Sequence, residues 1–196
     1  MAAPFDVMVI CLGNVCRSPL AEHILRLRLD ELLGEHSSTV RVTSAGVRAL
    51  VGSPMDESAA AELSRLGGDA DGFVATQMTG ARTTQADLVL TATRDQRSRV
   101  LEEAPRALKR TFTIREFAAL VGSNAPRAAE ATDPADLVAR MASWRGSIHL
   151  DDYDVPDPIG RAQDFHRTVA DMLERDCTVV ARALAAVVLK TEAAAG

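Results

Sequence analysis

The sequence predicts an α/β protein in which helices cover both faces of a parallel sheet. Two features of the 196-residue chain support this prediction. The first is a series of short runs rich in Val, Ile, Leu or Thr, each suited to a strand. The second is that segments with apolar residues at helical spacing separate these runs. Strands and helices that alternate in this way form parallel sheets with helices on both sides.

The first strand is expected at Phe5–Cys11 (FDVMVIC), and it runs directly into the loop LGNVCR. Ser18 and Pro19 then predict the start of a helix, with Ser18 as the N-cap and Pro19 in the first turn. Apolar residues such as Ile24 recur at helical spacing until Gly34, which is expected to end this helix. The loop thus lies between the carboxyl end of a strand and the start of a helix, where ligands bind in parallel sheets.

The middle of the chain continues the alternation. Further strands are expected at Thr39–Ser44, Ala86–Ala92 and Arg110–Ile114. Further helices are expected at Asp56–Leu66, which closes at Gly67-Gly68, at Arg94–Glu103 and at Arg115–Val121.

The last part of the chain is expected to hold an insertion and one long helix. Residues 123–154 are polar at both flanks, with a helical piece at Pro134–Trp144. From Phe165 to Val188, apolar residues recur every three or four positions, which predicts an amphipathic helix. The tail TEAAAG is expected to fray. No linker divides the chain, so residues 1–196 are expected to form a single domain.

Composition and charge argue against several classes of function. The net charge is −5 and no run of five Lys or Arg residues occurs, which argues against a nucleic-acid surface. No stretch is apolar and long enough to span a membrane, and no basic region precedes the first apolar run, so no signal peptide is expected. Cys11, Cys16 and Cys177 are too few for a disulfide framework, which favours a reducing, cytoplasmic setting.

The stretch Cys11–Pro19 (CLGNVCRSP) has four interpretations. A zinc site is disfavoured because the two cysteines lie five residues apart and the histidines are scattered. A redox pair is disfavoured because C-x-x-C is absent. A structural turn with two buried thiols remains open. The fourth interpretation is an anion-binding loop that carries a nucleophile.

The fourth interpretation gives each of these features of the loop a use. A loop of this length can curl so that its N–H groups point at one tetrahedral anion, and the helix N-terminus adds positive potential. Arg17 can bind two phosphate oxygens at once, and the same field favours Cys11 as a thiolate. Gly13 and Asn14 tolerate the left-handed backbone that a tight loop needs.

These residues, CLGNVCRSPLAE (Cys11–Glu22), resemble the signature of the low-molecular-weight protein tyrosine phosphatases. The stretches SAGV, VGSPMDESA, ADLVLT and DPIG resemble later parts of that family in the same order. The resemblance covers most of the chain, apart from residues 123–154 and the tail. It implies a three-layer α/β/α fold of the phosphatase I type, with a four-stranded parallel sheet in the order 2-1-3-4.

The resemblance also implies a mechanism. Cys11 would attack phosphorus to form a phosphocysteine, Arg17 would bind the phosphate oxygens, and Asp157 would act as general acid and then as general base. The implied substrate-binding residues are Leu12, Gly13, Asn14, Val15, Cys16 and Ser18, with Asn14 and Ser44 supporting the loop. No metal or cofactor is implied. The implied partner is a phosphotyrosine protein, with a tyrosine kinase as a candidate second partner, and the chain is expected to be a monomer or a weak dimer.

Several titratable residues compete for roles. Asp133 is interpreted as the N-cap of the helix that begins at Pro134, whereas Asp157 is followed by the Pro and Gly of the resembled acid loop. Cys16 has two interpretations that remain open: a packed thiol, or, by the resemblance, a thiol that bridges to Cys11 under oxidation. Cys177 is expected in the core. His23 and His166 are expected on solvated helix faces.

The chain departs from the resembled family where an aromatic substrate ring would bind. Ile159 follows Asp157-Pro158 where the family has an aromatic residue, and the loop RALVG (Arg48–Gly52) also lacks one. Phe73-Val74 replaces the family's usual His-Arg pair. We therefore expect Trp144 and Tyr153, in or beside the unmatched segment, to supply a replacement aromatic wall. Val15 favours phosphotyrosine, since the related arginine phosphatases carry Thr there.

Two alternatives remain open. One is an arsenate reductase of the same fold. The thioredoxin-coupled kind needs two further cysteines, and residues 75–95 contain none, but a form that uses an external thiol remains. The other is a catalytically altered module that only binds phosphoproteins. The joint presence of Cys11, Arg17 and Asp157 argues against it, because binding alone does not need an acid.

Overall fold

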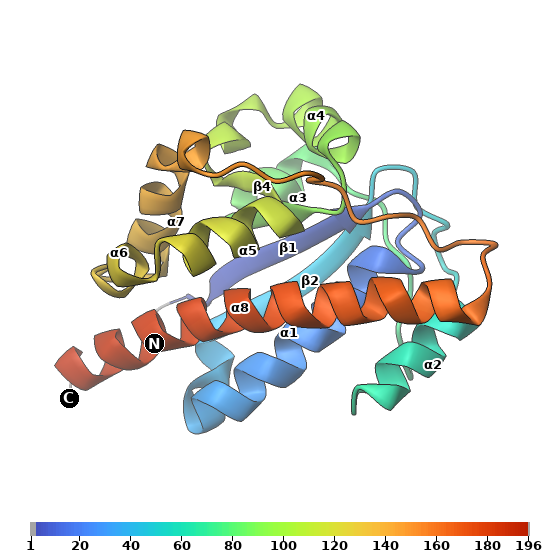
Figure 1. The fold of residues 1–196 in the computed structure, drawn as a ribbon, viewed down its shortest axis with the longest axis horizontal. Coiled ribbons are helices and arrows are strands. Elements are labelled where there is room, and N and C mark those ends of the chain that lie inside the picture. Colours follow the sequence, from blue (N-terminus) through green and yellow to red (C-terminus); the bar gives the residue numbers. More distant parts are fainter. Residues whose placement is uncertain (1–2, 196) are drawn as a thin grey trace.

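The computed structural model describes residues 3–195, and within them a four-stranded sheet forms the centre of a three-layer α/β/α fold (Figure 1). The strand order β2-β1-β3-β4 and the parallel pairing of all neighbours confirm the prediction. The strands are β1 Phe5–Cys11, β2 Val40–Gly46, β3 Leu88–Thr91 and β4 Thr111–Thr113. Helical connections return the chain to the same end of the sheet each time, which makes the pairing parallel.

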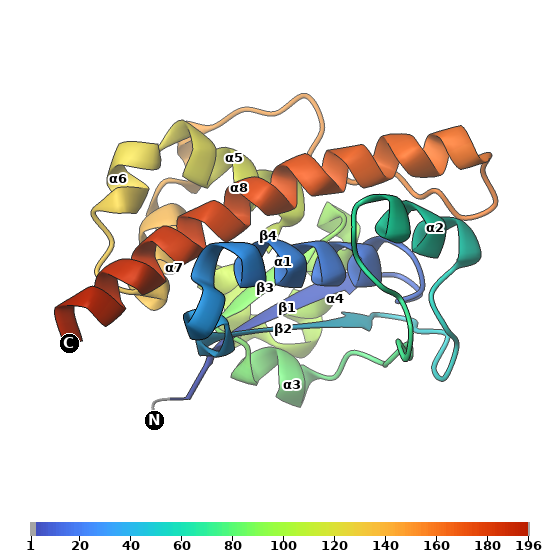
Figure 2. The ribbon, with the colours of Figure 1, turned by 90° about the horizontal axis from the view of Figure 1, so that it is seen from below.

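Helices cover the two faces of this sheet unequally (Figure 2). One face carries α1 Arg17–Leu33, α2 Glu57–Arg65, α5 Ile114–Ser123 and the long α8 Gln163–Ala195. The other face carries the shorter α3 Gly80–Gln85 and α4 Arg94–Glu103. Two further helices, α6 Ala125–Ala129 and α7 Pro134–Ser143, pack near the C-terminal half of α8, and short 3-10 turns lie at Gly34–Thr39, Pro105–Arg110 and Arg145–Ser147.

Strand β1 explains how both layers are held to the sheet. Val7, Val9 and Cys11 point into the larger apolar cluster beneath α1, α5 and α8. Met8 and Ile10 point to the opposite face, into a smaller cluster near α3 and α4. Successive side chains of a strand alternate between faces, so a strand covered on both sides needs a continuous apolar run. The run FDVMVIC meets that requirement.

The first helix corrects one prediction. Helix α1 begins at Arg17, and Cys16 occupies its N-cap position without making a side-chain cap. Ser18 is therefore inside the helix and is not its N-cap, because its hydroxyl bonds to Cys11 and Asn14 instead. Pro19 lies in the first turn, as predicted.

Other parts of the secondary structure also differ from the prediction. Helices α3 and α6 were not predicted, because they are short and bury only Thr83 and Ala128, respectively. The tail was expected to fray, but α8 continues to Ala195, and only Gly196 of that tail lies outside the described residues. Lys190 Nζ donates to the Ala131 carbonyl (3.1 Å) and Thr191 Oγ1 to the Thr132 carbonyl (3.0 Å), which holds this end of the helix.

The segment 123–154 packs as an integral part of the domain, and whether it is an insertion stays a prediction. Asp133 caps α7 by accepting from the Asp136 N–H (2.8 Å), as predicted. Leu137 and Met141 of α7 are fully buried. After α7 the chain crosses to the carboxyl end of the sheet (Figure 1), where the Val155 N–H donates to the Ala92 carbonyl (2.8 Å). This bond places the next residues beside the loop that follows β1.

Within residues 3–195, no helix combines the length and the apolar character needed to cross a membrane.

Candidate active site

The loop between β1 and α1 is organised around the Cys11 sulfur. Cys11 is the last residue of β1 and is almost fully buried. Its Sγ accepts hydrogen bonds from the Asn14 backbone N–H (3.3 Å) and from the Ser18 hydroxyl (2.9 Å). Two donors aimed at one sulfur suit a thiolate that attacks and later departs.

Asn14 holds this loop in shape. It is fully buried, and its φ of +54° is a left-handed conformation that Asn tolerates better than most residues. Its Nδ2 donates to Ser18 Oγ (2.9 Å) and to Ser44 Oγ (2.8 Å). Its Oδ1 accepts from the Thr76 N–H (2.7 Å). The amide therefore joins the loop to the end of β2 and to the segment before α3, and the contact with Thr76 had no signal in the sequence.

Arg17 and Asp157 lie together, although 140 positions separate them in the chain. Arg17 Nη2 pairs with Asp157 Oδ2 at 2.7 Å, and Arg17 Nη1 donates to the Val155 carbonyl at 3.1 Å. Arg17 is buried, whereas the Asp157 side chain is 45% exposed. The Ile159 N–H donates to the other oxygen of Asp157 (3.3 Å) and orients the carboxylate. The structure thus places a guanidinium and a carboxylate next to each other beside the Cys11 loop.

A cavity of about 360 Å³ opens over these groups. It is lined by Cys11, Leu12, Gly13, Val15, Cys16, Arg17, Arg48, Leu50, Asp157 and Ile159. Most of these are the residues that the sequence proposed for catalysis and substrate binding. Asn14, Ser18 and Ser44 lie behind the cavity wall and act on it through hydrogen bonds. Arg48 and Leu50 are lining residues that the sequence did not single out for a role.

The walls of this cavity are aliphatic, which overturns the expected aromatic replacement. Neither Trp144 nor Tyr153 is among the lining residues. The Trp144 ring lies under the Arg127 guanidinium (4.0 Å to the ring centroid), and the Tyr153 hydroxyl donates to the Ile148 carbonyl (3.4 Å). Both rings anchor the segment that leads to Asp157. Leu12, Leu50 and Ile159, all partly exposed, form the apolar rim of the cavity.

The remaining cysteines and histidines show one agreement and one correction. Cys177 is fully buried in the core, as predicted, and all three cysteines are free thiols. His166 was expected on a solvated face, but it is buried. The reason is that the first turn of α8 packs against α2, as shown by the bond from Gln163 Nε2 to Glu62 Oε1 (2.7 Å). His166 lies beside Cys16 and Asp56, so the structure groups three potential metal ligands that are far apart in the sequence.

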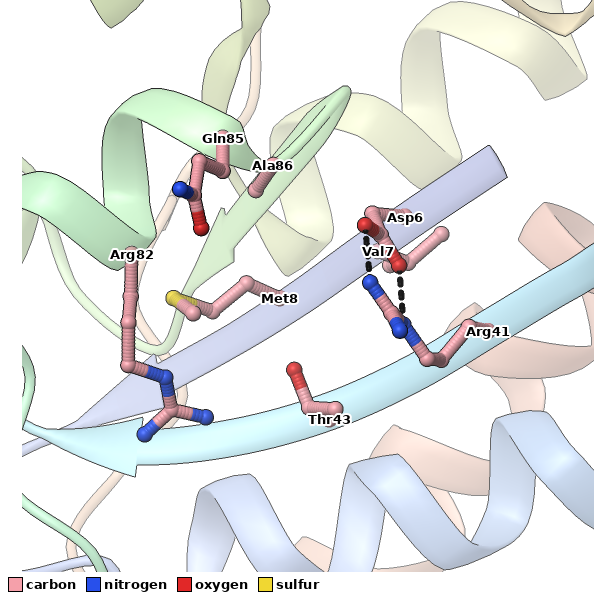
Figure 3. Close-up of a pocket in the computed structure, with 8 residues that line it drawn as sticks. All are labelled: Asp6, Val7, Met8, Arg41, Thr43, Arg82, Gln85 and Ala86. Atoms are coloured by element: carbon pink, nitrogen blue, oxygen red, sulfur yellow. Dashed lines mark hydrogen bonds and ion pairs between the residues drawn. The ribbon is translucent and has the colours of Figure 1, made fainter. Parts of the chain in front are cut away.

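A second cavity, of about 290 Å³, lies on the opposite face of the sheet, above β1 and β2 (Figure 3). Arg41 pairs with Asp6 across the two strands there, and Arg82 reaches over from α3. None of the residues that line it is a Cys, Ser or His, and its one carboxylate, Asp6, is already paired with Arg41. The chemistry predicted from the sequence belongs to the cavity over Cys11.

Comparison with known proteins identifies one family of phosphatases. The sequence model of a family described as low molecular weight phosphotyrosine protein phosphatase matches residues 6–135, which is more than half of the chain. This match includes Cys11 and Arg17 and ends before Asp157. The protein-tyrosine-phosphatase Etp of Escherichia coli strain K12 is 28% identical over 170 residues, covering 87% of this chain and 88% of Etp. The protein-tyrosine-phosphatase Ptp of Acinetobacter johnsonii is 30% identical over 109 residues, which cover 56% of this chain and 71% of Ptp.

Solved structures share the fold over nearly the whole chain. The tyrosine phosphatase Wzb from Escherichia coli K30, in complex with sulphate, is 27% identical with a TM-score of 0.66, covering 91% of this chain and 96% of Wzb. The YwlE arginine phosphatase from Geobacillus stearothermophilus is also 27% identical, with a TM-score of 0.68. The match covers 91% of this chain and 92% of YwlE. Similar structures thus include phosphatases for two different phosphorylated side chains.

Proposed function

Because this chain belongs to the low molecular weight phosphotyrosine protein phosphatase family, and is a phosphatase of that family, we propose that its substrate is phosphotyrosine in proteins. We propose that Cys11, Arg17 and Asp157 carry the reaction. The observation that carries this proposal is the convergence of the three groups on one cavity, with two donors already directed at the Cys11 sulfur. Nothing in the proposed reaction needs a metal or a cofactor.

In the first proposed step, the Cys11 thiolate attacks phosphorus and the bond from phosphorus to the phenolic oxygen breaks. The backbone N–H groups of residues 12–17 and the Arg17 guanidinium hold the three remaining phosphate oxygens and stabilise the charge of the transition state. The Asp157 carboxyl gives its proton to the departing phenolate. The products of this step are a tyrosine side chain and a phosphocysteine.

In the second step, a water molecule attacks the phosphocysteine and the sulfur–phosphorus bond breaks. Asp157, now a carboxylate, takes the proton of that water. The Ser18 hydroxyl, 2.9 Å from Cys11 Sγ, donates a hydrogen bond to the departing thiolate. Asn14 fixes the Ser18 oxygen by donating to it, which leaves the hydroxyl proton directed at sulfur.

The pair between Arg17 and Asp157 has a clear place in this sequence of steps. Arg17 Nη2 binds Asp157 and Arg17 Nη1 binds the Val155 carbonyl, so the guanidinium is held in place beside the cavity. An incoming phosphate dianion competes with the Asp157 carboxylate for Arg17 and binds it bidentately. The displaced Asp157 carboxyl is then free to carry the proton that the leaving group needs.

The preference for tyrosine rests on the apolar lining of the cavity. Val15, Leu50 and Ile159 present branched aliphatic side chains beside the anion-binding loop. Such walls suit the faces of a phenyl ring, whereas a phosphorylated guanidinium would need polar partners to replace its lost water. We also propose that the partner is a phosphotyrosine protein, which a tyrosine kinase would supply.

The test is phosphate release from peptides that are identical except for phosphotyrosine, phosphoserine or phosphoarginine at one position. We expect phosphotyrosine to be hydrolysed with the highest kcat/KM and Cys11→Ser to abolish the turnover. A higher kcat/KM for phosphoarginine would overturn the choice of substrate but keep the mechanism. Tight phosphopeptide binding with no turnover would favour the binding module, and arsenate-dependent consumption of NADPH in a coupled thiol system would favour the reductase.

A further inference from the structure

Three helices begin around one small, partly buried cluster behind the anion-binding loop. Cys16 is the N-cap of α1, Asp56 is the N-cap of α2, and His166 lies in the first turn of α8. The starts of α2 and α8 lie at the same end of the molecule as the loop after β1 (Figures 1 and 2). One sulfur, one carboxylate oxygen and one imidazole nitrogen, from Cys16, Asp56 and His166, all lie within 4.8 Å of one another. The side chains of this cluster have no role in the reaction proposed above, although Cys16 contributes its backbone to the anion-binding loop and lines the cavity.

The imidazole of His166 provides the first sign that the cluster binds something. The side chain is only 3% exposed, and its Nδ1 has no hydrogen-bond partner among residues 3–195. Asp56 Oδ1 lies 3.8 Å from this nitrogen, which is too far for a hydrogen bond. A buried polar atom without a partner destabilises a fold, so such atoms in native proteins usually meet a water, an ion or a ligand.

Cys16 provides the second sign. Its thiol is buried and makes no hydrogen bond within the described residues. A divalent cation would compensate the charge of a Cys16 thiolate and of the Asp56 carboxylate at once.

Asp56 can serve such a cation and keep its structural role. Its Oδ1 accepts from the Ala59 N–H (3.1 Å), and its own N–H donates to the Val15 carbonyl (2.7 Å). A carboxylate has about four lone-pair sites, so one cap bond leaves capacity for a metal. The bond to Val15 also means that Asp56 is already fixed to the anion-binding loop, and a fixed ligand costs little ordering entropy on binding.

We propose that Cys16, Asp56 and His166 form a zinc site behind the anion-binding loop. A thiolate, an imidazole nitrogen and a carboxylate oxygen are the ligand types that Zn²⁺ takes in proteins. An imidazole nitrogen and a carboxylate oxygen about 2.0–2.2 Å from Zn²⁺ in a tetrahedral site lie roughly 3.3–3.6 Å apart. His166 Nδ1 and Asp56 Oδ1 are 3.8 Å apart, so these two side chains would move slightly closer together when the metal binds. With three protein ligands, a water completes the fourth position. Binding releases the Cys16 thiol proton to solvent and changes no oxidation state.

The proposal has a consequence for the loop itself. Cys16 is the residue before Arg17, so a metal that fixes Cys16 to α2 and α8 also restrains the backbone next to the phosphate-binding guanidinium. A metal-bound Cys16 thiolate is also withheld from disulfide formation with Cys11. The site is independent of whether the chain prefers phosphotyrosine, because none of its three residues distinguishes the leaving group.

The experiment must exclude Cys11, which is a rival thiolate a few residues away. We would titrate tag-free Cys11→Ser protein with Co²⁺ and follow the thiolate-to-cobalt charge-transfer absorption, then displace Co²⁺ with Zn²⁺ to obtain its Kd. We expect one metal per chain in Cys11→Ser, and no charge-transfer band when Cys16→Ser is added. His166→Gln should weaken binding at least about 10-fold, since changes even beyond the direct ligands cost 10–100-fold.

Controls keep the result decisive. His23→Gln removes a histidine from α1 outside the cluster and should leave the Kd unchanged. Asp56→Asn keeps an oxygen for the cap of α2 but removes the charge, and it should weaken binding while circular dichroism stays that of the parent. An unchanged Kd in the Cys16→Ser or His166→Gln variants would overturn the proposal. So would a charge-transfer band that appears only when Cys11 is present.

Discussion

The floor and the rim of the cavity over Cys11 are built in opposite ways. The floor is buried and its parts are joined by hydrogen bonds: Asn14 and Ser18 have no exposed surface and Arg17 has 5%. The rim is exposed and presents aliphatic side chains that make no hydrogen bonds: Leu12, Leu50 and Ile159 are 39%, 57% and 48% exposed. The phosphate group is the same in every substrate, so a rigid floor can be preorganised to stabilise its transition state. The leaving group differs between substrates, so the rim that contacts it is free to vary.

This contrast predicts that changes in the floor lower kcat, whereas changes in the rim raise KM. The largest effect after loss of the nucleophile is expected for Arg17→Lys. Lysine keeps the charge but cannot bind two oxygens of the transition state in a planar fork, so kcat/KM should fall about 1000-fold. Steady-state kinetics with a phosphotyrosine peptide measures this. Arg48→Lys, at the rim, is the matched control, and equal losses in both variants would contradict the distinction.

Asp157 lies at the border between floor and rim. The loss of kcat on removing its carboxyl should depend on the leaving group of the substrate. Asp157→Asn should lower kcat about 100-fold on phenyl phosphate, because the phenolate needs a proton. The loss should be smaller on p-nitrophenyl phosphate, whose leaving group is stable without one. Asp151→Asn, an exposed residue earlier in the same segment, should change neither rate. An equal loss on both substrates would show that Asp157 is not the acid.

Asn14→Ala is expected to damage the floor without touching the substrate. This change removes the side-chain hydrogen bonds to Ser18, Ser44 and Thr76. Alanine also tolerates the left-handed φ of +54° less well than asparagine, because it has no polar side chain to bond locally. The free energy of unfolding should fall by about 2–3 kcal/mol, as measured by urea denaturation. Asn14→Gly tolerates the φ but also lacks the amide. If the glycine variant is as stable as the parent, the hydrogen bonds contribute nothing and the explanation fails.

The smallest effects are expected at the rim. Leu50→Ala and Ile159→Ala should each raise the KM for a phosphotyrosine peptide about 3- to 5-fold, which corresponds to about 1 kcal/mol of lost apolar contact, with kcat almost unchanged. Val74→Ala, which shortens an exposed side chain away from the cavity, is the control. Leu50→Trp should lower KM, because an aromatic face adds contact area. A fall in kcat equal to the rise in KM would contradict the separation of rim from floor.

Much of the floor could be predicted from the sequence because it is built from neighbours in the chain. Cys11, Asn14 and Arg17 lie within seven residues, and an apolar run before them and a helix after them fix where they meet. The parallel sheet also followed from the alternation of short apolar runs and helical segments. The incorrect role of Ser18 as a helix cap has a local cause as well. A hydroxyl at a helix start has several acceptors within reach, and the buried sulfur of Cys11 was the better one.

Only the tertiary structure decided what meets the floor from elsewhere in the chain. Leu50, Arg48 and Ile159 became the rim, and Trp144 and Tyr153 did not, because packing of the segment 123–154 against α5 and α8 fixed where those rings lie. The burial of His166 beside Cys16 and Asp56 likewise depends on how α8 docks on α1 and α2. Sequence periodicity assigns a residue to a helix face, but the neighbours of that face are set by contacts between helices far apart in the chain. The sequence therefore determined the chemistry of the anion-binding loop, and the docking of distant helices determined its surroundings.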